Sequence, residues 1–223
     1  MVSLFDILGP VMVGPSSSHT AGACRLGLMG RGILGGTPEQ AVIRLHGSFA
    51  ATGEGHGTHQ ALLGGLLGFA PDDLRLRTAY REAEQVNLRY SFEEIDLGED
   101  AHPNSAVLQL RRDESTLEVQ GASIGGGRIL ITGIDGFHVE LGGDYHTLVV
   151  LARDEPGTIA TIAGLLARRG VNVATIRADR TGRRKNALMT LEVDERIDDD
   201  VLAELKRYEW LRWARRVPKI AGG

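Results

Sequence analysis

The last third of the chain shows a regular succession of apolar and polar segments. Residues 147–152 (TLVVLA) are almost entirely apolar and predict a strand buried on both faces. The next apolar residues recur at helical spacing from Ile159 to Leu166, and Gly170 is placed to end that helix. Strands are predicted over 171–178 and 187–193. Three aspartates at 198–200 favour a second helix, and a last strand is expected over 210–217.

This order of elements, βαββαβ, predicts a ferredoxin-like domain, in which two helices cover a four-stranded sheet. The charge balance changes where that domain begins. Residues 1–143 carry ten Lys/Arg and seventeen Asp/Glu, whereas residues 144–223 carry fifteen and twelve. The pair Gly142-Gly143 lies at this change, so we expect an α+β protein with domains 1–143 and 144–223.

Residues 1–143 show a less regular pattern that predicts a mixed α+β domain. Its helices are expected at residues 3–8, 21–34, 60–67 and 79–87. Its strands are expected at residues 41–46, 106–111, 116–120 and 128–132. The segments expected to form loops or tight connections are 15–20, 53–58 and 125–127.

Composition narrows the classes of protein that fit. The net charge of -4 gives no basic excess for nucleic acid, and no apolar run approaches the roughly 18–20 residues of a membrane span. The N-terminal segment has no basic region or cleavage site of a secretory signal. Fifteen glycines but only six charged residues fall in the first 70 positions. That segment is either a tightly packed core or a surface covered by another chain or a substrate.

The chain has one cysteine, Cys24, which we expect to be buried and structural. One cysteine cannot form an intrachain disulfide, and it cannot supply the ligands of a structural zinc site or an iron–sulfur cluster. Any cluster that the protein uses must therefore be held mainly by another chain. The absence of disulfides predicts a cytoplasmic location.

The segment Gly14-Pro15-Ser16-Ser17-Ser18-His19-Thr20 places hydroxyls and an imidazole before an expected helix start. Backbone N–H groups there are unpaired and partly positive, so the segment can hold a carboxylate. The alternative is a helix N-cap with spare serines. Because capping requires only one serine, the sequence favours the anion site.

Two further segments carry candidate chemistry. Gly53-Glu54-Gly55-His56-Gly57-Thr58-His59 places two imidazoles in a glycine-rich loop, where they can act as base or ligand or simply be exposed. No zinc-binding helix pattern accompanies them. His102-Pro103-Asn104-Ser105 precedes a strand and, by itself, is typical of a turn.

Taken together, these segments and ASIGGGRILI at 122–131 resemble the beta subunit of iron–sulfur-dependent L-serine dehydratases. The opening SLFDILGPVMVGPSSSHTAGA and the segment HGSFAATGEGHGTHQALLGGLLG carry the resemblance most specifically. The C-terminal domain, with Asp154-Glu155-Pro156-Gly157, resembles an ACT domain, which senses amino acids. Residues 1–143 are also similar to a small-molecule-binding domain of some phosphoglycerate dehydrogenases.

The resemblance implies a lyase that converts L-serine to pyruvate and ammonia without pyridoxal phosphate. In the two-subunit form, an alpha subunit supplies the cysteines of a [4Fe-4S] cluster, which acts as Lewis acid on the serine hydroxyl. The resemblance thus implies an alpha-subunit partner, with the SSSHT and GHGT loops facing it at the active site. A homodimer formed through the ACT or the N-terminal domain is also expected.

We expect His56 to be the base that removes the α-proton, with His19 in support. The residues expected to hold the substrate are Ser16, Ser17, Ser18, Thr20, Thr58, His102 and Asn104. In the ACT domain, Asp154, Gly157 and Asn172 are expected at adjacent ends of neighbouring elements. The resemblance implies that such loops bind a free amino acid at a dimer interface, and we expect weak binding of serine there. The alternative is a domain that only dimerises.

Two points set alternatives beside this interpretation. Many relatives carry Asp where this chain has His59. If that Asp orients the neighbouring imidazole in them, His59 can orient His56 only in a different way. The alternative function is a non-catalytic, amino-acid-sensing subunit, which would need the ACT loop but neither His19 nor His56.

Overall fold

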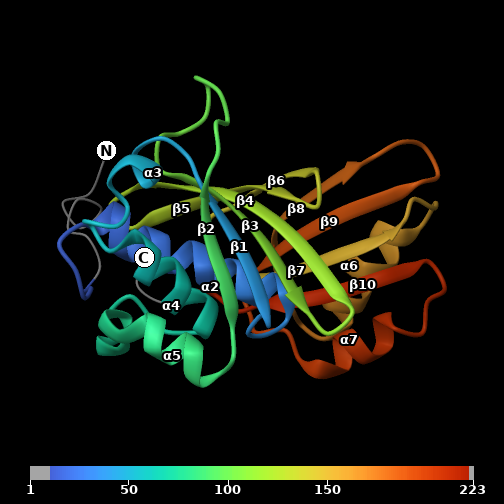
Figure 1. Cartoon of the computed structure of the whole chain (residues 1–223). Helices are drawn as coiled ribbons and strands as arrows, with labels where there is room; N and C mark the ends of the chain where they lie inside the picture. Colours follow the sequence, from blue (N-terminus) through green and yellow to red (C-terminus); the bar gives the residue numbers. More distant parts are fainter. Residues whose placement is uncertain (1–10, 221–223) are drawn as a thin grey trace, which may run out of the picture.

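The computed structural model describes residues 11–220, so the helical turn expected at 3–8 lies outside the described part (Figure 1). The N-terminal domain contains a six-stranded sheet with the order β2-β1-β3-β4-β5-β6. Its strands are β1 (Gln40–Leu45), β2 (Arg89–Glu94), β3 (Ser105–Arg112), β4 (Ser115–Gly125), β5 (Arg128–Ile134) and β6 (Phe137–Leu141). β1 and β2 are parallel, and the other neighbours are antiparallel.

Helices pack against this sheet and bury its apolar side chains in one core. They are η1 (Ser17–Gly22), α2 (Ala23–Leu34), α3 (Ser48–Thr52), α4 (Thr58–Leu67), η2 (Leu74–Thr78) and α5 (Ala79–Gln85). The loop predicted at 15–20 is therefore wrong from Ser17 onward. η1 is a π-helical turn that runs directly into α2, with Ser16 as its N-cap.

α2 and α4 approach each other so closely that only glycine fits between them. A Cβ on Gly27 would lie 2.3 Å from the Leu62 carbonyl oxygen, and one on Gly65 would lie 2.0 Å from the Cys24 carbonyl oxygen. Glycine in this segment therefore serves tight helix packing, the first of the two alternatives that composition left open.

The C-terminal domain has the expected βαββαβ order. Its elements are β7 (His146–Arg153), α6 (Thr158–Arg168), β8 (Val173–Arg180), β9 (Asn186–Val193), α7 (Asp199–Leu205) and β10 (Leu211–Val217). The sheet order is β10-β7-β9-β8. Gly170, with a φ of 69°, follows the end of α6 as predicted.

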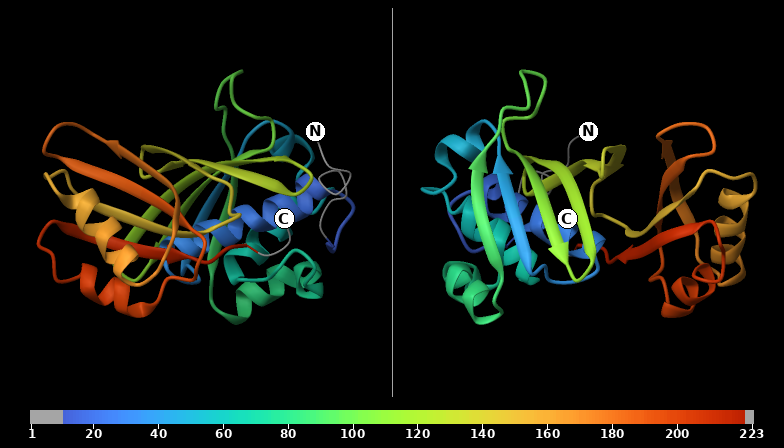
Figure 2. Two further views of the ribbon diagram at one scale, coloured as in Figure 1. Left: turned by 180° about the vertical axis from the view of Figure 1, so that it is seen from behind. Right: turned by 45° about the vertical axis from the view of Figure 1, so that its right-hand side comes forward.

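The two domains lie side by side (Figure 2), and residues of the C-terminal sheet join the core of the N-terminal domain. Leu148 and Val150 on β7 belong to the core beneath α6 and α7, whereas Val149 belongs to the core of the N-terminal domain. Alternate residues of β7 therefore face opposite cores, which explains its uninterrupted apolar sequence. Val217 on β10 joins the same boundary against α2. No helix among residues 11–220 is long and apolar enough to cross a membrane.

Candidate functional site

The histidine of the SSSHT segment is held at the first turns of two helices. His19 Nδ1 lies 2.9 Å from Thr58 Oγ1, at the start of α4, and its Nε2 lies 3.3 Å from Ser48 Oγ, at the start of α3. Burial first, and then the charge of His56, lowers the pKa of His19 below its ordinary 6.5. A neutral ring can donate to one hydroxyl and accept from the other, so the site favours neutral His19.

His56 lies beside His19 but is exposed. The two ring centroids are 4.9 Å apart. His56 occupies the turn between α3 and α4, where its backbone N–H donates to the Thr52 carbonyl. Gly57 follows in the left-handed conformation with a φ of 75°, which allows the chain to turn into α4. His56 is thus the accessible imidazole of the pair, and His19 is the buried one.

The three serines differ in what their side chains do. Ser16 Oγ accepts the backbone N–H of His19 at 3.2 Å, so it caps η1. Ser17 and Ser18 are half-buried, and within residues 11–220 their hydroxyls make no hydrogen bond. One serine is therefore used by the fold, as expected for capping, and two hydroxyls remain for a ligand.

Thr20 and Thr58, both expected to hold the substrate, have different surroundings. Thr20 is 4% exposed, and its Oγ1 has no hydrogen-bond partner among the described residues. Thr58 is fully buried, and its hydroxyl contacts His19. Thr58 has no surface for a substrate in this structure, which corrects that expectation and makes it a positioning residue.

The other two motif segments contact two different helices, α3 and α2. Pro103, in the HPNS turn, lies against Gly47, immediately before Ser48. His102 Nδ1 accepts the Asn104 N–H, and the Asn104 carbonyl accepts the Ser123 N–H of β4. In the triple-glycine connection, the carbonyl of Gly127 accepts a hydrogen bond from Arg25 of α2 at 2.7 Å.

A hollow of about 260 Å³ opens beside His56. Its polar lining includes Thr20, Glu54, Gln60 and Arg77. The site residues predicted from the sequence did not include Glu54, Gln60, Arg77 or Ser48. Arg77 lies on a short 3-10 helix with no apolar periodicity, so no sequence pattern connected it to the histidines.

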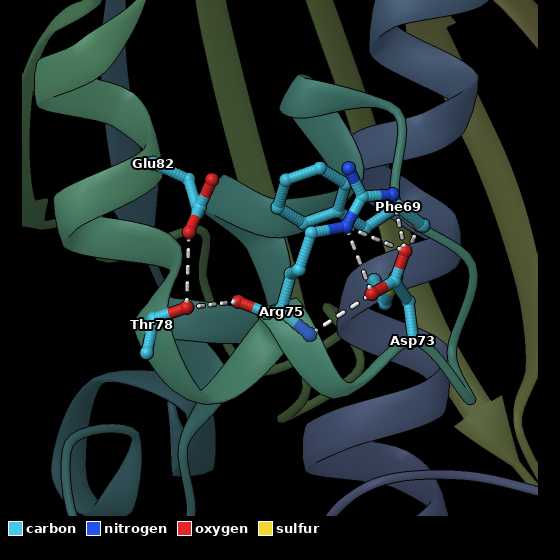
Figure 3. Close-up of polar contacts among 6 residues, drawn as sticks. Phe69, Asp73, Arg75, Thr78 and Glu82 are labelled. Atoms are coloured by element: carbon cyan, nitrogen blue, oxygen red, sulfur yellow. Dashed lines mark hydrogen bonds and ion pairs between the residues drawn. The ribbon is translucent and has the colours of Figure 1, made fainter.

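Arg77 lies on η2, and contacts at both ends hold this short helix in place. Figure 3 shows these contacts. Asp73 caps η2 through the Arg75 N–H and pairs with the Arg75 guanidinium at 2.6 Å. That guanidinium lies 4.1 Å from the centre of the Phe69 ring. At the other end, Thr78 Oγ1 donates to Glu82 at 3.2 Å. These contacts hold η2, and with it Arg77, against the hollow.

His59 faces away from this pair. Its ring stacks on Phe92 of β2, with centroids 4.1 Å apart. Burial lowers the pKa of His59, and Glu54 opposes that shift. His59 therefore serves the packing of α4 on the sheet, and its ring partner is Phe92 rather than His56.

Cys24 does not fit the role of a cluster ligand. It is fully buried in α2, and its thiol donates to the Phe69 carbonyl at 3.1 Å. Burial raises its pKa to about 12, which disfavours the thiolate that metals require. Among residues 11–220, no group of three or more His, Cys, Asp or Glu side chains is placed to hold a metal ion.

The ACT-domain residues do not lie together within one chain. β7 and β8 both pair antiparallel with β9, so they run in the same direction. Asp154 follows the end of β7, and its backbone N–H donates to the Lys185 carbonyl. Asn172 precedes β8, and its carbonyl accepts the backbone N–H of Asp194. The two are therefore separated by a strand length, roughly 25 Å for eight residues. The expectation that they lie at adjacent ends is wrong.

Comparisons with known proteins identify both parts of the chain. Residues 3–133 match the family described as serine dehydratase beta chain, and residues 146–209 match the ACT domain. The probable L-serine dehydratase beta chain of Bacillus subtilis is 44% identical over 205 residues, covering 92% of this chain and 93% of that one. The L-serine dehydratase beta chain of Peptoniphilus asaccharolyticus is 37% identical, with 96% and 97% covered.

A relative of another kind matches a large part of the chain. D-3-phosphoglycerate dehydrogenase of Synechocystis is 29% identical over 196 residues, covering 86% of this chain and 35% of that enzyme. The similarity extends across both domains of the present chain. It agrees with the expected likeness to a domain of such dehydrogenases.

Proposed function

Because the chain belongs to the serine dehydratase beta chain family, we propose that it works with an alpha subunit to convert L-serine to pyruvate and ammonia. Loss of the α-proton and the β-hydroxide leaves an enamine, which water converts to these products. The observation that carries the proposal is the exposed His56, which lines the hollow. The centre of its ring lies 4.9 Å from the centre of the buried His19 ring.

His56 is the proposed base for the α-proton. An imidazole accepts a proton near neutral pH, and a base must reach the substrate in its unprotonated form. His19 is held by Thr58 and Ser48, so it is less free to move a proton. Its ring instead packs beside the ring of His56 and helps to hold His56 in place.

The substrate carboxylate is assigned to the SSSHT segment, of which Thr20 lines the hollow. Ser17 and Ser18 keep hydroxyls that make no hydrogen bond within the described residues, and Thr20 adds a buried one. They lie in the first turn of η1, where backbone N–H groups carry partial positive charge. His102 and Asn104 are proposed to approach the substrate from the HPNS turn.

The [4Fe-4S] cluster is assigned to the alpha subunit, because Cys24 is buried and protonated. This division leaves removal of the α-proton and binding of the carboxylate to the beta subunit. No pyridoxal phosphate is part of the proposal.

The ACT domain is proposed to bind an amino acid, for which L-serine is the first candidate, between two copies of the chain. Asp154 and Gly157 lie at one end of the sheet and Asn172 at the other, so two chains are needed to bring them together. This proposal therefore includes a homodimer. Calorimetry with L-serine that shows no heat would leave the domain as a dimerisation module.

The test is reconstitution with the alpha subunit under anaerobic conditions, followed by a pyruvate assay. His56→Ala is expected to lower kcat by about 100- to 10,000-fold, as loss of a general base does. His138→Ala is the matched control, because His138 is an exposed histidine on β6. If His56→Ala keeps most of the activity while the complex still assembles, the chain is instead a non-catalytic sensing subunit.

A further inference from the structure

We propose that a second ligand site lies between the two domains and binds a small anion with two or more negative charges. A cleft of about 430 Å³ separates them there, a size typical of small-molecule sites. One wall is the C-terminal end of α2 with the β3–β4 hairpin, and the other is α7 with β10. His19 lies in η1, at the opposite end of the continuous helix, so this cleft is separate from the hollow at His56.

The cleft carries an excess of positive charge. Five cationic side chains line it, against the two carboxylates of Asp113 and Asp199: Arg31, Arg112, Lys206, Arg215 and Arg216. Arg216 forms an ion pair with Asp199, and Arg112 Nε lies 3.8 Å from Asp113 Oδ2. The other three cations have no carboxylate partner within residues 11–220.

Backbone carbonyls hold the guanidinium groups without neutralising them. Arg112 donates to the Gly35 carbonyl at 2.6 Å, and Arg215 donates to the Leu34 carbonyl at 3.4 Å. Arg216 donates to the Ile197 carbonyl at 2.9 Å. Each guanidinium has five N–H donors, so donors remain for a ligand. Since these side chains are half-buried, an anion would find them partly desolvated and already oriented.

Two glycines make room for this arrangement. A Cβ on Gly36 would lie 2.1 Å from Arg112 Nη1, and one on Gly35 would lie 3.0 Å from Arg215 Nε. Capping the negative end of α2 accounts for one or two cations at this place. It does not account for the remaining excess of positive charge, which is complementary to the charge of a phosphate ester or a polycarboxylate.

The test is calorimetry on the full chain without the alpha subunit, so it does not depend on the proposed function. The probes are inorganic pyrophosphate and citrate, at an ionic strength fixed with sodium chloride. Wild type is expected to bind at least one probe. The double change Lys206→Gln with Arg215→Gln should weaken binding by about tenfold or more, since it removes charged hydrogen-bond donors.

Arg212→Gln is the matched control, because Arg212 is exposed on β10 and lies outside the cleft. The single change Lys206→Glu guards against misfolding, since the Lys206 side chain makes no hydrogen bond within the described residues. Binding of pyrophosphate alone identifies a phosphoryl ligand, and binding of citrate alone identifies a carboxylate ligand. Absence of heat with both probes, or equal weakening in Arg212→Gln, would overturn the site.

Discussion

The imidazole of His19 and the hydroxyl of Thr58 lie 2.9 Å apart and join the first turns of η1 and α4. Their contact depends on the packing of α2 against α4, where Gly27 and Gly65 bring the two backbones together. The same glycines that close the core therefore place the buried histidine beside the loop that carries His56.

Adding a methyl group at this helix contact should be costly. Gly27→Ala would put a Cβ 2.3 Å from the Leu62 carbonyl oxygen, so backbone must move. We expect a loss of about 1–3 kcal/mol in the free energy of unfolding, measured by urea denaturation. Gly164→Ala on α6 is the control, since its Cβ would meet only the Arg168 side chain at 3.5 Å. There alanine should leave stability unchanged or raise it by up to about 1 kcal/mol. Equal effects at the two glycines would contradict the packing argument.

Removing the hydroxyl of Thr58 should disturb His19 without opening a cavity. Thr58→Val keeps the shape but leaves His19 Nδ1 without its partner in a buried place. The expected cost is about 1–3 kcal/mol of stability, with a lower kcat in the assembled enzyme. Thr58→Ser retains the hydroxyl, so it should recover most of kcat. A Thr58→Ser enzyme no more active than Thr58→Val would show that the hydroxyl does not position His19.

Much of the fold follows from sequence pattern, and the failures have physical causes. The βαββαβ domain was predictable because its strands and helices have distinct periodicities. β2 (Arg89–Glu94) was missed because it is a polar edge strand with mostly exposed side chains. α3 was missed because five residues are too few to show a helical period. β6 was missed although Phe137, Val139 and Leu141 alternate, because five residues after a turn give a weak signal.

The site was predicted in part. The histidines and serines stood out as residue types, but their partners depend on tertiary packing. Ser48 reaches His19 across 29 positions of sequence. Asp154 and Asn172 lie at opposite ends of the sheet, contrary to the prediction, because β7 and β8 run in the same direction. The local sequence shows which chemical groups are present, whereas strand pairing and helix packing determine which of them are in contact.

Acidification should destabilise the protein through His19. Its folded-state pKa is lowered by burial, so the unfolded chain binds the proton more readily. The stability linked to neutral His19 is therefore complete above 6.5 and is lost as the pH falls toward the lowered pKa. The urea midpoint of unfolding should fall between about pH 7.5 and about pH 5.5, and the fall should be smaller in His19→Gln than in wild type. His59→Phe, which keeps a ring on Phe92, separates the similar contribution of His59. Equal pH slopes in wild type and His19→Gln would exclude this role.

Cys24 should be inert in the folded chain. A pKa of about 12 and complete burial leave almost no accessible thiolate at neutral pH. A thiol reagent should therefore label Cys24 slowly in native buffer and rapidly in urea. Anaerobic reconstitution of the isolated chain with iron and sulfide should leave it colourless. A cluster absorption that disappears in Cys24→Ala would contradict both this prediction and the assignment of the cluster to the alpha subunit.

Arg77 should contribute to binding of the substrate carboxylate. It lines the hollow that His56 also lines, and it makes no ion pair within residues 11–220. η2 is anchored by Asp73 and Arg75, so the guanidinium is carried on a fixed wall. A carboxylate in the hollow would therefore share it with this cation and with His56. Arg77→Gln should therefore raise KM for L-serine by about tenfold or more in the assembled enzyme, with a smaller change in kcat.

Arg81→Gln supplies the comparison, because Arg81 is an exposed arginine on α5 whose nearest carboxylate is Glu82 at 3.5 Å. Its KM should match that of wild type. The affinity for the alpha subunit must be measured alongside, since an exposed arginine can also bind a partner's acidic side chain. If Arg77→Gln weakens assembly but leaves KM unchanged once the complex is saturated, Arg77 belongs to the subunit interface, and the carboxylate is held by Ser17, Ser18 and Thr20 without it.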